Sequence, residues 1–338
     1  MKKQNKKPNG RHLPKVLALS VSAIMASTVA TTVSQASDIE IYKAAAISET
    51  TVMFMLDISG SMMSNHSNPV FARPACELAT TQAMTPRSQV QTPIPGGPSY
   101  TRRWCEVTSG SLRGNHIDRM TRVKDGMVDV LYGNPAKNIE RLDDKFVIGL
   151  STLGAMGGGS DVGAVLVPAR RLDAVINGKT QRDILIDRII NLSPGTSTPT
   201  ARSYAETIAY LMGTATINQT GSGWLYSDNT TKMTSSNVYK APTTVTGISN
   251  DLKQCNKYGI YVLTDGVPNV SNPTSSLAQA ALGKTFSCTN SDAGWDCTEK
   301  MNLALRDPTK NIQGIEVRTA VVGFGSDFNS VSSYDPQA

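Results

Sequence analysis

A short apolar segment that ends on a carboxylate constrains this chain more than any other feature. Residues 51–56 read Thr-Val-Met-Phe-Met-Leu, a run of mostly apolar, partly β-branched residues with polar flanks. This pattern is typical of a buried strand. Asp57 follows at the carboxyl end, and the small residues Ser59, Gly60 and Ser61 come next. Such a loop can turn until one carboxylate and two hydroxyls face a common point, which predicts a site for a hard cation.

Further apolar segments alternate with amphipathic ones along the chain. Strands that alternate with helices indicate a mainly parallel sheet with helices on both faces. We therefore expect an α/β, doubly wound fold in residues 51–338. Besides residues 51–56, the predicted strands are 145–153 and 162–168, which form a hairpin, 258–264 and 316–325. The predicted helices are 118–133, 181–192, 298–306 and one that begins at Thr200 or Ser203 and ends near Gly213.

Three long polar stretches interrupt this alternation, at about 64–117, 214–254 and 267–297. They are rich in Pro, Ser, Thr and Gly and have no sustained hydrophobic period. Stretches of this kind predict irregular insertions between the regular elements.

The first 36 residues predict export. A basic stretch up to Lys15 is followed by an apolar stretch at 16–33 and by Ser34-Gln35-Ala36, a small-x-Ala cleavage site. The apolar stretch is also long enough for an uncleaved membrane anchor, although its many Ser and Thr residues favour a cleaved signal peptide. Residues 37–50 form a lead-in to the first strand.

The basic excess of the chain belongs to this front segment. Residues 1–36 hold 6 of the 33 basic residues and no acid, so 27 basic residues remain against 27 acidic ones. A balanced body excludes a broad basic surface, and we expect no nucleic-acid partner.

The five cysteines are interpreted in the light of export. In an oxidising compartment Cys76 with Cys105, and Cys288 with Cys297, are candidates for local disulfides, and Cys255 is left over. Sequence alone does not determine the pairing, and five free thiols remain the alternative. The chain has no Cys-x-x-Cys and few histidines, which disfavours a zinc site.

A second aspartate and a hydroxyl-rich loop complete the candidate site. Asp265 ends the predicted strand 258–264, and residues 196–200 precede a predicted helix. In parallel sheets ligands gather at the carboxyl ends of the strands, so we expect two carboxylates and at least three hydroxyls to meet there. An all-oxygen set suits Mg²⁺ or Mn²⁺, with Ca²⁺ as an alternative that usually has more carboxylates. Each residue alone has a local explanation as a turn former or helix cap.

Three motifs carry a family resemblance. "LDISGS" resembles the Asp-x-Ser-x-Ser signature of the von Willebrand factor A domain, "TPTARS" its threonine loop and "LTDGVPN" its second aspartate loop, in the family's order. The resemblance implies a metal-ion-dependent adhesion site that holds Mg²⁺. Its ligands would be Asp57, Ser59, Ser61, Thr198, with Thr196 as the alternative, and Asp265 through water. It implies a protein partner that offers an exposed Asp or Glu, and no small-molecule substrate.

A narrower resemblance comes from the setting of these motifs. The signal peptide, the "SDIEIY" lead-in and the cysteine-bearing insertion resemble the amino-terminal part of type IV pilus tip-associated adhesin and biogenesis proteins, the PilC/PilY class. This implies a role in pilus biogenesis or adhesion, export through the periplasm, and a place at the pilus tip, cell surface or outer membrane. The partner would be a pilin, a pilus assembly factor or a host receptor. Family members usually carry a β-propeller, and an A domain a closing helix; neither follows before Ala338, so we expect a fragment.

A structural scaffold and a hydrolase are the two alternatives to an adhesion module. A structural cell-surface scaffold unrelated to pili would use the metal only to stiffen its loops. An aspartic hydrolase is disfavoured because an extra residue separates Asp57 from Gly60, and because Gly266 follows Asp265 at once. A serine hydrolase is disfavoured because this sequence has no Gly-x-Ser-x-Gly elbow. The candidate bases, His66 and His116, lie in or beside an insertion. We therefore expect no enzymatic activity.

Overall fold

The computed structural model describes residues 48–63, 75–79, 82–157, 161–195, 197–266, 268–270, 274–288 and 295–323. The predicted signal peptide at 1–36, most of the lead-in, and Thr196 lie outside these described residues. So does the chain after residue 323.

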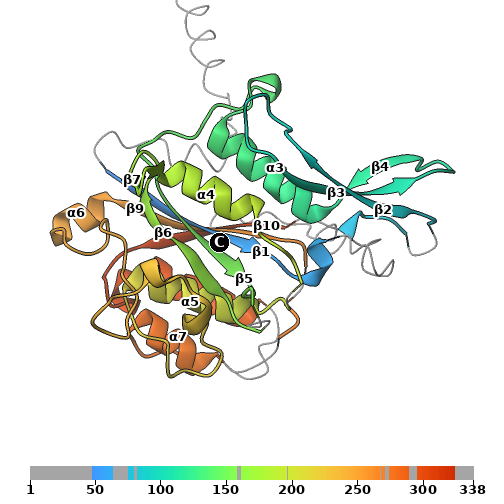
Figure 1. Cartoon of the computed structure of the whole chain (residues 1–338). Helices are drawn as coiled ribbons and strands as arrows, with labels where there is room; N and C mark the ends of the chain where they lie inside the picture. The colour runs from blue at the N-terminus through green and yellow to red at the C-terminus, as the bar shows by residue number, and fades with distance from the viewer. Residues whose placement is uncertain are drawn as a thin grey trace, which may run out of the picture. The chain divides into compact units, whose positions relative to one another are not determined.

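A five-stranded sheet forms the centre of the fold, in the order β10-β9-β1-β5-β6 (Figure 1). The first four of these strands are parallel, and β6 runs antiparallel to β5. The mixed α/β class, the mainly parallel sheet and the predicted hairpin are thereby confirmed. The strands are β1 (Thr50–Asp57), β5 (Val147–Leu153), β6 (Ala164–Arg171), β9 (Lys257–Thr264) and β10 (Val317–Gly323).

Helices lie on both faces of this sheet (Figure 1). On one face lie α3 (Arg119–Tyr132) and α4 (Gln181–Ile190). On the other lie α5 (Thr200–Met212) and α7 (Ser275–Leu282), and residues of α8 (Asp296–Arg306) join the same core. Because both faces are covered, all eight residues of β1 are buried, which explains its continuous apolar run.

Local signals define the helix ends. The Asp118 side chain accepts a hydrogen bond from the Thr121 backbone N–H at 2.8 Å and caps the start of α3. Gly213 ends α5 with φ +67°, a backbone conformation that glycine adopts without steric cost. At its other end, helix α5 begins at Thr200, which is the earlier of its two predicted starts.

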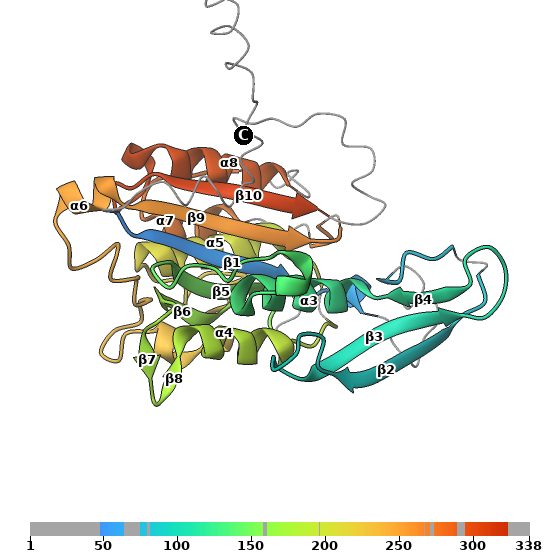
Figure 2. The same ribbon diagram turned by 90° about the horizontal axis from the view of Figure 1, so that it is seen from above.

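The prediction of an irregular insertion at 64–117 is wrong for its second half. Residues 85–117 form an antiparallel sheet of three strands, hereafter the insertion sheet, which extends to one side of the central sheet (Figure 2). It contains β2 (Thr85–Gln91), β3 (Tyr100–Val107) and β4 (Gly114–Ile117). Strand β2 is largely exposed and polar, so it lacks the apolar alternation by which a half-buried strand is recognised.

The later insertions are partly regular as well. Residues 214–254 run mostly in turns and end in the short helix α6 (Asn250–Cys255), as expected of a polar insertion. The prediction of an irregular stretch at 267–297 is wrong where α7 lies. Leu277, Ala278, Ala281 and Leu282 of α7 are buried in the main core. The remaining short elements are β7 (Val175–Ile176), β8 (Lys179–Thr180), and the 3₁₀ turns Gly60–Met62, Pro135–Lys137, Trp224–Tyr226, Asn229–Thr231 and Pro308–Lys310.

Both predicted disulfides are present. Cys76 pairs with Cys105, and Cys288 pairs with Cys297, while Cys255 is free and exposed. Disulfides of this kind indicate an oxidising environment, as expected for an exported protein. Among the described residues, no helix combines the length and apolar character needed to cross a membrane.

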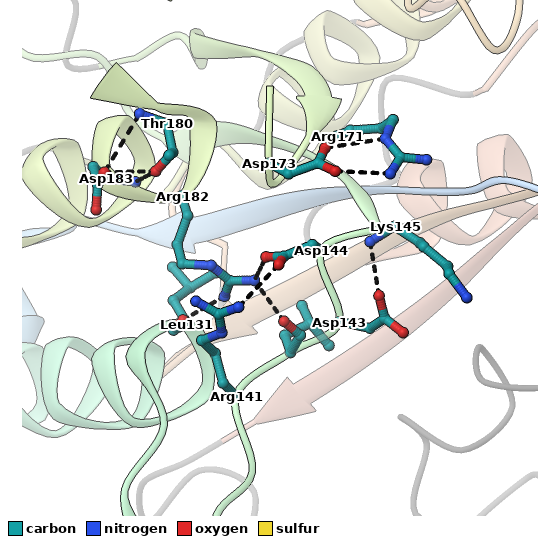
Figure 3. A network of polar contacts seen from close by, with 11 residues as sticks. Leu131, Arg141, Asp143, Asp144, Lys145, Arg171, Asp173, Thr180, Arg182 and Asp183 are labelled. Atoms are coloured by element: carbon teal, nitrogen blue, oxygen red, sulfur yellow. Dashed lines mark hydrogen bonds and ion pairs between the residues drawn. The ribbon is translucent and has the colours of Figure 1, made fainter. Parts of the chain in front are cut away.

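A polar network fastens the end of the sheet where β5 begins (Figure 3). The Arg182 guanidinium donates to the backbone carbonyls of Leu131 and Leu142 and to the Asp144 carboxylate, the last at 2.6 Å. Arg182 is buried in α4, whereas Asp144 reaches the surface. This network ties α4 to the chain between α3 and β5, at the amino end of the parallel strands.

Candidate functional site

The sheet register brings the two predicted aspartates together. Strands β1 and β9 are parallel neighbours, with Leu56 opposite Leu263, so both strands end at the same edge of the sheet. The Thr264 hydroxyl donates to Asp57 Oδ2 at 2.6 Å, and the Asp265 backbone N–H lies 3.4 Å from the same oxygen. Asp57 and Asp265 are both buried.

The loop after β1 adds two hydroxyls to this pair. The Ser59 backbone N–H donates to Asp57 Oδ1 at 2.7 Å. The Ser59 and Ser61 hydroxyl oxygens are 3.0 Å apart, and the Ser61 hydroxyl donates to Asp265 Oδ1, also at 3.0 Å. Ser61 therefore links the first predicted loop directly to the aspartate of the third.

The threonine loop adjoins the other two through backbone groups. The Gly195 N–H donates to the Ile58 carbonyl at 3.0 Å. The Thr198 N–H donates to Asn269 Oδ1 at 2.7 Å, and the Asn269 N–H lies 3.3 Å from the Thr198 carbonyl. Thr198 is buried. The three predicted loops thus meet at the carboxyl ends of β1 and β9.

A guanidinium that sequence reasoning missed also enters the site. Arg119, the first residue of α3, places Nη1 2.6 Å from Asp265 Oδ2, and both side chains are buried. Thr264 and Asn269 were missed as well, although both lie within the "LTDGVPN" segment. Nothing in the local sequence marks Arg119, because its contact spans 146 positions of the chain.

Burial and like charge make Asp57 a weak acid. Desolvation in the closed site, and then the negative charge of Asp265, raise its pKa from 3.8 to about 6. Hydrogen bonds from Ser59 and Thr264 oppose this rise without cancelling it. The negative charge of Asp57 is therefore poorly compensated in the folded chain.

The chemistry of the donor set fits a hard divalent cation. The site combines two carboxylates with the hydroxyls of Ser59 and Ser61, all oxygen donors, which Mg²⁺ and Mn²⁺ prefer. In the part of the chain that the structure describes, no three side chains of His, Cys, Asp or Glu gather to hold a metal ion. Asp57, Ser59, Ser61 and Asp265 are the residues that would hold the ion, and Thr198, whose backbone bonds to Asn269, is the further candidate.

Comparison with protein-family models, with curated proteins and with solved structures finds no match for this chain.

Proposed function

We propose that the carboxyl end of the sheet binds a divalent cation, and that the chain uses this site to hold an acidic group of a protein partner. The ion would be Mg²⁺, or Mn²⁺ in its place, with Ca²⁺ as the alternative. The ligands would be Asp57, Ser59, Ser61 and Thr198, with Asp265 acting through water. The chain would then be a von Willebrand factor A-like adhesion module without enzymatic activity.

One observation carries this proposal: two buried carboxylates at the ends of neighbouring strands are linked through Ser59 and Ser61, with Asp57 poorly neutralised. Carboxylates that repel each other in a buried site cost stability unless a cation or a proton relieves them. The Asp57–Thr264 and Ser61–Asp265 contacts hold both acids in position for one shared ion. Structural ion pairs also perturb pKa values, but such perturbation at a strand-end loop is typical of functional sites.

The donor set also supports an acidic partner. With Asp57 as the one directly bound carboxylate and neutral hydroxyls as the other ligands, the ion itself keeps much of its positive charge and attracts a carboxylate as a further ligand. Two disulfides fit an exported module that works outside the cytoplasm. The resemblance to type IV pilus tip-associated proteins extends the proposal to a pilin, an assembly factor or a host receptor as the partner, at the pilus tip or cell surface.

Calorimetric titration of the protein with Mn²⁺ tests the cation site. We expect one site in the wild-type chain and none in Asp57→Asn, which keeps the shape of the side chain but removes its charge. At about 100 times the dissociation constant, the ion should add about 2.7 kcal/mol to the unfolding free energy of the wild type alone. Asp144→Asn is the matched control, because this acid lies at the other end of the sheet and reaches the surface.

A pair of peptide pools tests the partner. One pool of random peptides carries a fixed central aspartate, and the other carries asparagine at that place. We expect the immobilised protein to retain more of the aspartate pool in Mn²⁺ and to lose this preference in EDTA. Equal retention of both pools in Mn²⁺, or a preference that survives EDTA, contradicts the adhesion function. A Mn²⁺ site without any peptide preference would favour the structural scaffold instead.

A further inference from the structure

The guanidinium of Arg119 enters the site from outside the three motifs that carry the family resemblance. The Asp118 cap fixes the start of α3, so Arg119 reaches the site from a well-defined helix end. Its side chain is 7% exposed and that of Asp265 is 0% exposed, so the pair is shielded from solvent. A buried pair of this kind interacts more strongly than one at the surface.

The pairing is uneven between the two acids. Both oxygens of Asp265 are engaged, Oδ1 by the Ser61 hydroxyl and Oδ2 by Arg119. The hydrogen bonds that hold Asp57 come from neutral donors: the Ser59 and Asp265 backbone N–H groups and the Thr264 hydroxyl. Arg119 therefore pairs with Asp265, one of the two carboxylates that the proposed ion would also need.

The guanidinium also keeps an unused donor. Its Nε is buried, and among the described residues no atom accepts a hydrogen bond from it. A buried donor without a partner costs free energy. The contact with Asp265 therefore leaves part of the guanidinium unsatisfied, so that Asp265 compensates its positive charge only in part.

Because of Arg119, the net charge of the site changes from negative to positive when a divalent cation binds. Two carboxylates and one guanidinium sum to −2 + 1 = −1, and a divalent cation brings the site to −1 + 2 = +1. Without Arg119 the loaded site would be neutral, −2 + 2 = 0. A buried net positive charge favours an anionic group as the remaining ligand.

We propose that Arg119 is a built-in counter-ion that competes with the divalent cation for Asp265 and, once the cation is bound, makes the site selective for a carboxylate. This inference rests on the proposed cation site. It gives one residue two opposite effects, because the same positive charge opposes cation binding and favours anion binding. A purely structural role for Arg119 would weaken both kinds of binding when the residue is replaced.

Arg119→Gln and Arg119→Lys test the proposal by Mn²⁺ titration without any partner. Removing a buried unit charge next to the ion should tighten Mn²⁺ binding by about tenfold or more in Arg119→Gln. Arg119→Lys keeps the charge and should stay close to the wild type. Arg102→Gln is the matched control. Arg102 also pairs with an acid, Asp125 of α3, but this pair does not include Asp57 or Asp265. This variant should leave the Mn²⁺ affinity unchanged.

The two peptide pools give the second readout. In saturating Mn²⁺, Arg119→Gln should lose most of the preference for the aspartate pool, and Arg119→Lys should keep part of it. Thermal melting in Mn²⁺ checks that each variant is folded. Mn²⁺ is included because the bound ion supplies the positive charge beside Asp265 that Arg119→Gln removes. If Arg119→Gln binds Mn²⁺ no more tightly than a wild type that does bind it, this inference is wrong and the cation site stands. If neither protein binds Mn²⁺, the proposed function itself has failed.

Discussion

The two ends of the central sheet deal with buried charge in opposite ways. At the amino end, Arg182 donates to two backbone carbonyls and to Asp144, whose carboxylate reaches solvent (Figure 3). At the carboxyl end, two acids are buried near each other, and the one guanidinium beside them pairs with Asp265 alone. The first arrangement gives the buried guanidinium three acceptors and leaves its carboxylate partner at the surface, whereas the second retains a net negative charge. Stability alone explains the amino end, and the carboxyl end calls for a function.

The largest effect should come from breaking the amino end. Arg182→Ala leaves the Leu131 and Leu142 carbonyls without their donor inside the protein. We expect the unfolding free energy to fall by about 3 kcal/mol, since hydrogen bonds from a charged donor to buried acceptors are lost. Urea denaturation measures the loss.

Arg141→Ala is the matched control for this variant. Arg141 also pairs with Asp144, but both side chains of that pair are exposed. An exposed pair contributes less than about 1 kcal/mol. If the two variants lose the same stability, burial does not distinguish the two arginines, and the contrast between the ends of the sheet is not supported.

The opposite sign is expected at the carboxyl end. In EDTA at pH 8, Asp57→Asn should be more stable than the wild type, because the substitution removes a buried charge that Asp265 repels. A pKa of about 6 in the folded chain against an ordinary 3.8 corresponds to roughly 3 kcal/mol at high pH. Asparagine replaces one carboxylate oxygen with an amide, so we expect a gain of about 2 kcal/mol. A loss of stability in EDTA would contradict the picture of an unrelieved charge.

This gain should depend on pH in a defined direction. The folded-state pKa of Asp57 is raised, so the folded chain holds its proton more tightly than the unfolded chain does. Wild-type stability is therefore lost, relative to Asp57→Asn, as pH rises through about 6. The difference between the two proteins should fall from about 2 kcal/mol at pH 8 to below about 1 kcal/mol near pH 5, and it should change sign by about pH 4, where the folded chain holds Asp57 protonated. Denaturation midpoints across this range check the sign.

The smallest effect is expected from an exposed ion pair, which serves as a reference for the buried charges at the two ends of the sheet. Lys179 and Asp187 form an exposed ion pair at 2.6 Å beside α4. Solvent screens such a pair, so Lys179→Ala should leave the urea midpoint unchanged within experimental error. A clear shift would mean that surface charge contributes to stability in this fold, and the effects at the two ends would then need correction for it.

The parts of the fold that could be predicted are those that carry a local pattern. The apolar run that ends on Asp57 predicted β1. Because β1 and β9 are parallel neighbours, Asp57 and Asp265 meet at the same edge of the sheet, as predicted. Helix α3 has its cap at Asp118 and its glycine end at Gly133, and both are visible in the sequence. Export and short cysteine spacings made both disulfides candidates, although sequence alone did not determine the pairing, and the structure contains both.

What could not be predicted depends on tertiary contact. Strand β2 is exposed and polar, and its only partner in the described chain is β3. Helix α7 is short and follows a polar stretch, so its eight residues show too little periodicity to be recognised. The contacts of Arg119 and Asn269 with the site arise from how α3 and the loop after β9 pack. Whether Thr198 or Thr196 would be the ligand remains a prediction, with Thr198 beside Asn269.

The insertion sheet has a mechanical consequence. Its chain arrives from the loop that carries Ser59 and Ser61, and it leaves into α3, whose first residue contacts Asp265. The Cys76–Cys105 bridge and the hydrogen bond from Tyr100 to Asp125 fasten the sheet to these two connections. A tensile load applied to the sheet would therefore reach α3, and through its first residue the buried Asp265.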